Sequence, residues 1–226
     1  MRQRLDKIQA QIAAACTRAK RDSSSVQLLA VSKLHPIELI EEAYDLGLRN
    51  FGENYVQELV DKREKLAYLP GIRWHLIGHL QSNKAKLALA HADVFQSLDS
   101  VKLVNDLGKR AREIGLGAPW PVFIQVNVDF EQSKAGADPK DLPALIAAVC
   151  EESALKLEGL MCIPEPKSDI EQMRPAFKRL VELAHRHGLH DAKFSMGMSD
   201  DFTVAIEEGA HCIRVGRRLF GERESV

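Results

Sequence analysis

The stretch LLAVSK, residues 28–33, decides the fold through its own pattern and through the pattern of the segment after it. It is a short apolar run, and the segment between Pro36 and Gly47 has the apolar spacing of an amphipathic helix. Proline is favoured at the start of a helix and glycine just past its end, so these two residues mark the helix limits. A second short apolar run comes next, at residues 49–52. This order predicts a strand, a helix and a second, parallel strand.

The same alternation continues along the whole chain. Several of the apolar runs are too continuous for a sheet with one wet face, which fits parallel strands covered on both faces. Strands are expected at residues 27–33, 49–52, 73–78, 94–98, 122–128, 155–163, 193–196 and 212–216. Eight strand–helix units in 226 residues favour a closed (β/α)8 TIM barrel over a doubly wound sheet.

An extra helix is expected before the first strand. Leu5, Ile8, Ile12 and Ala15 have the spacing of one helix face, and charged residues interrupt them, which is not the pattern of a signal peptide. Neither a Gly/Ser/Pro-rich linker nor an apolar run long enough to span a bilayer interrupts the sequence. We therefore expect residues 1–226 to form a single barrel domain.

The composition excludes several classes of partner. The formal net charge is −1, from 31 basic and 32 acidic residues without long charged tracts, so neither nucleic acid nor a membrane surface is expected to bind. The four cysteines, each among apolar neighbours, form no CxxC pair and match no zinc spacing, which indicates a reducing, cytoplasmic setting without a structural metal. Because no apolar helix face is left over, a monomer is expected.

Lys33 is the first candidate for chemistry, since function in a barrel gathers at the carboxyl ends of the strands. Alternation places Leu29, Val31 and Lys33 on one face of the first strand. Partial burial lowers the pKa of a lysine, and the neutral amine can attack an aldehyde. The alternative is an ordinary strand-end lysine whose ammonium group reaches solvent.

The last two strands end in residues suited to phosphate. Arg214 and Gly216 share a face of strand eight, and the loop after strand seven carries Ser195, Gly197 and Ser199. Ser199 is also expected to cap the next helix. Loops seven and eight are the usual phosphate-binding place in this fold. Either loop alone is explained by ordinary turn chemistry, whereas both beside Lys33 favour a phosphate site.

The middle strands add weaker candidates. Asn54 could donate a hydrogen bond to a ring oxygen of a ligand, and Lys134 is positioned to reach the mouth of the barrel. His75 is either a base or a core histidine, and its spacing to His79 lacks the helical context of a metal site.

Five motifs occur together and in order. They are AVSK at 30–33, FGENYVQE at 51–58, HLIGHLQSNK at 75–84, SMGMSDD at 195–201 and IRVGR at 213–217. With these motifs the chain resembles the pyridoxal phosphate homeostasis proteins over nearly its whole length. The resemblance implies a barrel like the N-terminal domain of alanine racemase, the fold-type III arrangement, with pyridoxal 5′-phosphate (PLP) as cofactor.

The resemblance also implies roles for the site residues. Lys33 would carry PLP as a covalent Schiff base, and Arg214 would face the pyridine nitrogen. Asn54 and Ile77 would lie against the ring. The phosphate would bind the backbone N–H groups of Gly216 and Arg217, helped by Ser195 or Ser199.

The arginine separates the possible functions. Because an arginine cannot readily give up a proton, it leaves the pyridine nitrogen unprotonated and weakens the ring as an electron sink. We therefore expect a protein of intracellular vitamin B6 homeostasis that holds PLP, contacts PLP-dependent enzymes transiently and has no catalytic residues. The alternative is an amino-acid racemase, and a weak residual racemase activity also stays open. The tyrosine-bearing second domain of alanine racemases is not expected here. A cofactor-free Schiff-base aldolase acting on a sugar phosphate is a third.

Two departures from the family pattern concern the cofactor contacts. Many relatives have a small hydroxyl residue where this chain has Arg217, and Thr-Lys where it has Leu34-His35. A cofactor affinity different from that of the relatives is therefore expected.

Overall fold

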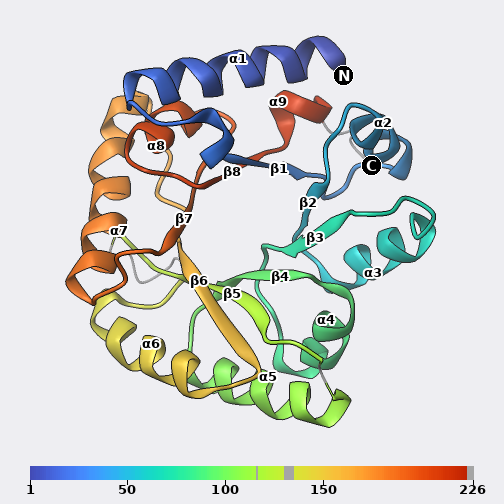
Figure 1. The fold of residues 1–226 in the computed structure, drawn as a ribbon, viewed down its shortest axis with the longest axis vertical. Helices are drawn as coiled ribbons and strands as arrows, with labels where there is room; N and C mark the ends of the chain where they lie inside the picture. The colour runs from blue at the N-terminus through green and yellow to red at the C-terminus, as the bar shows by residue number, and fades with distance from the viewer. Residues whose placement is uncertain (116, 130–134, 223–226) are drawn as a thin grey trace.

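The computed structural model, which describes residues 1–115, 117–129 and 135–222, is a closed barrel of parallel strands (Figure 1). The strands follow one another around the barrel in chain order, and β8 pairs with β1 to close it. They are β1 Gln27–Val31, β2 Asn50–Glu53, β3 Arg73–Leu76, β4 Val94–Leu98, β5 Trp120–Gln125, β6 Leu155–Met161, β7 Lys193–Met198 and β8 Cys212–Val215. The predicted TIM barrel is confirmed.

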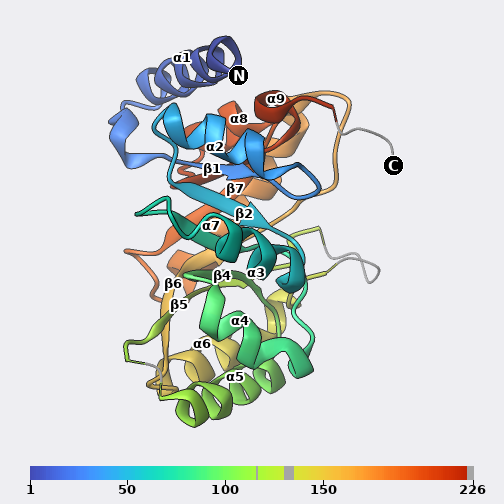
Figure 2. The same ribbon diagram turned by 90° about the vertical axis from the view of Figure 1, so that its right-hand side faces the viewer.

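Helices form a ring outside the barrel (Figures 1 and 2). The α-helices are α1 Arg2–Arg18, α2 Ile37–Asp45, α3 Val56–Lys65, α4 Ala85–His91, α5 Val101–Ile114, α6 Leu142–Glu151, α7 Arg174–Arg186, α8 Phe202–Glu207 and α9 Arg217–Phe220. Short 3-10 helices occupy Ser23–Ser25, Ser82–Lys84, Pro139–Asp141 and Ile170–Met173. The expected N-terminal helix is α1, which lies beside α8 and α9 and buries the predicted face.

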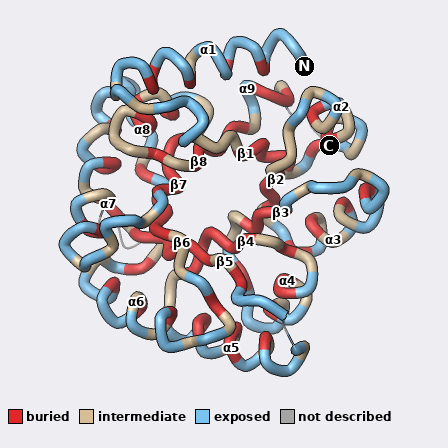
Figure 3. Tube along the Cα trace, viewed as in Figure 1, coloured by how far each residue is buried: buried red, intermediate tan, exposed pale blue. Residues whose placement is uncertain are grey.

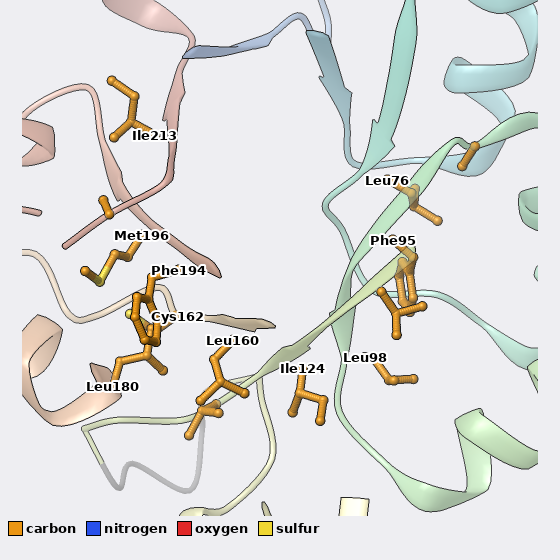
Figure 4. Close-up of a cluster of buried hydrophobic side chains, with 14 of the residues drawn as sticks. Leu76, Phe95, Leu98, Ile124, Leu160, Cys162, Leu180, Phe194, Met196 and Ile213 are labelled. Carbon is orange, nitrogen blue, oxygen red and sulfur yellow. The ribbon is translucent and has the colours of Figure 1, made fainter. Parts of the chain in front are cut away.

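The main core is the apolar layer between the strands and the helices (Figure 3). Figure 4 shows part of it, to which strand residues such as Ile124 and Leu160 and the α7 residue Leu180 contribute. The inside of the barrel is different, because several of its buried side chains are polar, among them His75, Gln96 and Arg214. The structure therefore has an apolar layer outside the sheet and a polar network within it.

Some predicted boundaries differ from those observed. β5 ends at Gln125; Val126 N–H still donates to Met161 O of β6 at 2.8 Å, but Asn127 N–H donates to Ala137 O of a loop at 2.9 Å. Pro36 caps α2 and does not open its first turn. Ser199 was expected to cap the helix after strand seven, which is wrong: α8 begins at Phe202 with Asp201 at its cap.

Other expectations concern single features. Lys134 lies outside the described residues. Within those residues, no helix combines the length and the hydropathy that a membrane crossing requires. Cys16, Cys162 and Cys212 are buried, whereas Cys150 is exposed, and all four are free thiols.

Candidate functional site

A pocket of about 530 Å³ opens at the carboxyl ends of the barrel strands. This volume lies within the roughly 300–1,000 Å³ of small-molecule sites. Its lining comprises Val31, Lys33, Asn54, Ile77, Ile163, Met198, Ser199, Asp200, Arg214, Gly216, Arg217, Gly221 and Glu222. Seven of the eight residues that the resemblance assigns to the cofactor therefore meet in one place, and Ser195 is the exception.

Lys33 lies just after β1, at the start of a tight turn. Its neighbour Leu34 has φ +61°, a left-handed conformation that is uncommon for a residue other than glycine. Leu34 N–H donates to Glu58 Oε1 at 2.5 Å, and the Ser32 hydroxyl donates to Glu53 Oε1 at 2.6 Å. The residues on both sides of Lys33 are thus bonded to carboxylates from β2 and α3.

Lys62 of α3 joins these carboxylates. Its ammonium donates to Ser32 O and Glu58 Oε1, both at 2.7 Å, and to Glu53 Oε1 at 2.9 Å. Lys62 and Glu53 are both buried, and Glu53 Oε2 has no hydrogen-bond partner among the described residues. Burial raises the pKa of the Glu53 carboxyl to about 7, although the Lys62 ammonium and the Ser32 hydroxyl oppose the shift.

Arg214 forms the opposite wall. It is only 4% exposed, and its guanidinium donates to Ser195 Oγ at 2.7 Å and to Cys162 O at 2.8 Å. Burial lowers the pKa of Arg214 from its ordinary value, while the nearby Cys212, Cys162 and Asp201 oppose the shift. An arginine in a protein nevertheless keeps its charge, so this wall carries a fixed cation.

Ser195 does not line the pocket, and its expected contact with a phosphate does not fit this position. Its hydroxyl is fully buried, accepts from Arg214 and donates to Gln96 Oε1 at 2.7 Å. The hydroxyl is therefore occupied on both sides. Ser195 orients Arg214 from inside the barrel, and Ser199 is the serine that lines the pocket.

His75 continues the same network deeper in the barrel. Its Nδ1 lies 2.9 Å from Gln96 Nε2 and its Nε2 lies 3.3 Å from Asn50 Oδ1. An amide NH2 can only donate, so His75 Nδ1 accepts from Gln96, while His75 Nε2 lies between Asn50 Oδ1 and the Gln27 amide nitrogen, the latter at 3.4 Å. Burial, with a smaller contribution from Arg73, lowers the pKa of His75 to about 3. Of the two interpretations open from the sequence, the structure favours the core histidine.

Glycines allow the loops around the pocket to approach one another. A Cβ on Gly78 would lie 2.2 Å from the backbone oxygen of Asn54, so only glycine lets these two loops touch. A Cβ on Gly216 would lie 3.1 Å from Val31 O, beside the end of β1. These contacts bring Asn54 and Ile77 to one side of the pocket and keep β8 close to Lys33.

The loop after β7 is ordered by a buried aspartate. Asp201 Oδ1 accepts from Met198 N–H at 2.5 Å, and burial raises the pKa of this carboxyl. At the rim, Arg217 Nη2 lies 2.7 Å from Asp200 Oδ2, an exposed ion pair that joins the loops after β7 and β8.

Sequence reasoning missed the charged network beside Lys33. Glu53 and Glu58 lie within a quoted motif, but neither was singled out. Lys62 could have been found, because it shares the buried face of α3 with Val56 and Leu59, where a lysine is unexpected.

Chemically, the pocket combines an amine, a fixed cation, a hydroxyl and an apolar wall of Val31, Ile77, Ile163 and Met198. These groups suit a ligand with an aldehyde, a flat ring and an anionic end. In the described part of the chain, no group of three His, Cys, Asp or Glu side chains is arranged to hold a metal ion.

Comparisons with known proteins agree with this chemistry. The family model for the alanine racemase N-terminal domain matches residues 3–224. The pyridoxal phosphate homeostasis protein of Pseudomonas aeruginosa strain PAO1 is 46% identical over 96% of this chain and 94% of its own. That of Aquifex aeolicus is 40% identical over 98% of each chain.

Among solved structures, PipY of Synechococcus elongatus PCC7942 with PLP bound superposes with a TM-score of 0.80. It is 38% identical, and the match covers 95% of this chain and all of PipY. The chain belongs to the pyridoxal phosphate homeostasis protein family, within the wider family of alanine racemase N-terminal domains.

Proposed function

We propose that this protein binds PLP in the pocket, with Lys33 as the covalent tether, and takes part in pyridoxal phosphate homeostasis in the cytoplasm. One observation carries the proposal: the Lys33 side chain and the buried guanidinium of Arg214 line the same cavity. The PLP-bound structure of PipY supports it. Residues 1–226 would act as one PLP-binding domain.

The pocket residues fit the parts of the cofactor. Arg214 would bind at the pyridine nitrogen, and Asn54 and Ile77 would contact the ring. Ser199 and the backbone of Gly216 and Arg217 would hold the phosphate. When bound, PLP supplies an aldehyde that a neutral lysine amine converts to a Schiff base with loss of water.

The proposed role is that of a carrier without turnover of its own. Arg214 leaves the pyridine nitrogen without a proton and so disfavours carbanion chemistry. Two-base racemisation needs a second acid or base, and the described lining offers only carboxyl groups for this, Asp200, which pairs with Arg217, and Glu222, with no tyrosine, histidine or second lysine. Tyr55, in the loop after β2, is 62% exposed and is not among the lining residues.

The setting and the partners of the carrier are also part of the proposal. The free thiols of Cys16, Cys150, Cys162 and Cys212 are compatible with the reducing cytoplasm. The protein would act as a monomer and would meet PLP-dependent enzymes only transiently, when it releases the cofactor.

Titration with PLP tests this function. Wild-type protein is expected to develop the yellow absorbance of a lysine Schiff base, and Lys33→Ala is expected to lack it. Half-buried Lys84, bonded to Gln57, provides the matched control, since Lys84→Ala should leave the band unchanged. A colourless wild-type protein would refute PLP binding.

Turnover and ligand class need separate assays. D/L-alanine exchange at ordinary enzymatic rates would contradict the carrier role. A Schiff base with a sugar phosphate, formed without PLP, would instead favour an aldolase.

A further inference from the structure

We propose that Lys62, Glu53 and Glu58 position the reactive lysine by fixing the backbone on both sides of Lys33. We refer to these three side chains and Ser32 as the Lys62 network. The consequence for cofactor binding rests on the proposed function, whereas the backbone restraint does not depend on it.

The bonds of the Lys62 network reach the residues on either side of Lys33. Lys62 holds the carbonyl of Ser32, the residue before Lys33. Glu58 holds the amide of Leu34, the residue after it. A lysine ammonium has three protons, and the three acceptors of Lys62 use all of them. Lys62 therefore links Ser32 directly to Glu53 of β2, and it reaches Leu34 through Glu58.

The turn needs such a restraint because of its conformation. A non-glycine residue with positive φ persists only when the surrounding structure holds it. The Leu34 side chain is 61% exposed, so packing of this side chain does not hold the turn in place. The turn is closed by His35 N–H, which donates to Ser32 O at 3.0 Å, and the hydrogen bond from Leu34 N–H to Glu58 ties it to α3.

Burial makes the Lys62 network specific. The Lys62 and Glu53 side chains are only 5% and 0% exposed, and breaking one partner of a buried pair leaves an uncompensated charge. Asp61 and Lys65 form an ion pair of the same spacing as Glu58 and Lys62 on the same helix, at 2.9 Å, but both are more than half exposed. This exposed pair is a control with matched chemistry.

The test uses full-length protein with and without PLP. Without PLP, amide hydrogen exchange at Leu34 is expected to be at least about tenfold faster in Glu58→Ala and Lys62→Met. With PLP, the apparent dissociation constant is expected to rise about tenfold in the same variants. Glu58→Gln keeps an acceptor oxygen, so both its Leu34 exchange rate and its dissociation constant should stay close to those of the wild type. Asp61→Ala and Lys65→Met should resemble wild type.

The outcomes are separable. If Lys62→Met does not fold, Glu58→Ala decides, since Glu58 is less buried. Unchanged Leu34 exchange and unchanged PLP affinity in Glu58→Ala would overturn the inference, as would equal effects in Asp61→Ala. If the wild type formed no Schiff base, the proposed function would fail, and Leu34 exchange alone would decide for or against the restraint.

Discussion

The two walls of the pocket hold a basic side chain in different ways. On the β1–β2 wall, the Lys62 network fixes the main chain on either side of Lys33 with buried charges. On the β7–β8 wall, neutral groups of Ser195 and Cys162 fix the guanidinium of Arg214 itself. A lysine that reacts with an aldehyde needs its amine free of hydrogen-bond partners that would block the reaction. An arginine that recognises a ring nitrogen needs its guanidinium held in one orientation. The comparison indicates that the first wall restrains the main chain beside Lys33, whereas the second restrains the side chain of Arg214.

The walls should also respond differently to substitution. A buried charge that loses an oppositely charged partner is expected to cost more than a buried charge that loses one neutral acceptor. Substitutions in each wall test this difference, from the largest expected effect to the smallest.

Lys62→Met should have the largest effect on stability. It removes the ammonium from Ser32 O, Glu53 and Glu58 and leaves buried Glu53 with the Ser32 hydroxyl as its donor, which is expected to lower the free energy of unfolding by about 3–5 kcal/mol. Urea denaturation measures it. Lys65→Met, which breaks an exposed pair, should cost less than about 1 kcal/mol, and equal losses would contradict the account.

Glu53→Gln should change how stability depends on pH. Glu53 has a folded-state pKa of about 7 against 4.5 ordinarily, so the folded state binds the extra proton between these values. Its stabilising contribution is full below pH 4.5 and is lost as pH rises toward 7, by on the order of 3 kcal/mol.

The glutamine variant lacks this titration, so its stability relative to wild type should increase between pH 4.5 and 7. Urea denaturation at both pH values measures the difference. Parallel pH profiles of the two proteins would show that Glu53 does not titrate in this range.

Ser195→Ala tests the neutral wall. It removes one acceptor from Arg214 and one donor from Gln96, at an expected cost of about 1–3 kcal/mol in unfolding free energy. The PLP affinity should fall because the guanidinium is less firmly oriented. Ser97 also donates from the barrel wall, to Gly78 O, so Ser97→Ala is a control that leaves Arg214 untouched. A loss of affinity in Ser97→Ala alone would contradict the role given to Ser195.

Arg217→Ala should have the smallest effect. Its ion pair with Asp200 is exposed, so the change in unfolding free energy is expected to stay below about 1 kcal/mol. PLP affinity should change little if the phosphate is bound through the backbone of Arg217, which alanine keeps. A loss of affinity beyond about tenfold would mean that the guanidinium itself binds the cofactor.

Much of the fold was predictable because each strand carries its own signal. The run ending at Val31 and the helix closed by Gly47 are local patterns, and a parallel barrel repeats them. Residues after strand ends, such as Lys33 and Gly216, meet in a barrel whatever the loop details. Their roles toward PLP stay predictions.

The features that could not be predicted depend on contacts across the barrel. Ser195 lies in a strand pattern that fits either the pocket or the interior, and only its bond to Gln96, 99 residues away, decides. The role of Lys62 likewise depends on where α3 meets the end of β1. Neither contact is encoded in local spacing.

The central claim is that Lys33 tethers the cofactor, and borohydride reduction of the PLP-loaded protein with peptide mass spectrometry tests it most directly. The account predicts a reduced pyridoxyl phosphate group on the peptide containing Lys33, and none in Lys33→Ala. A wild-type protein labelled only at other lysines, or labelled equally after Lys33→Ala, would contradict it.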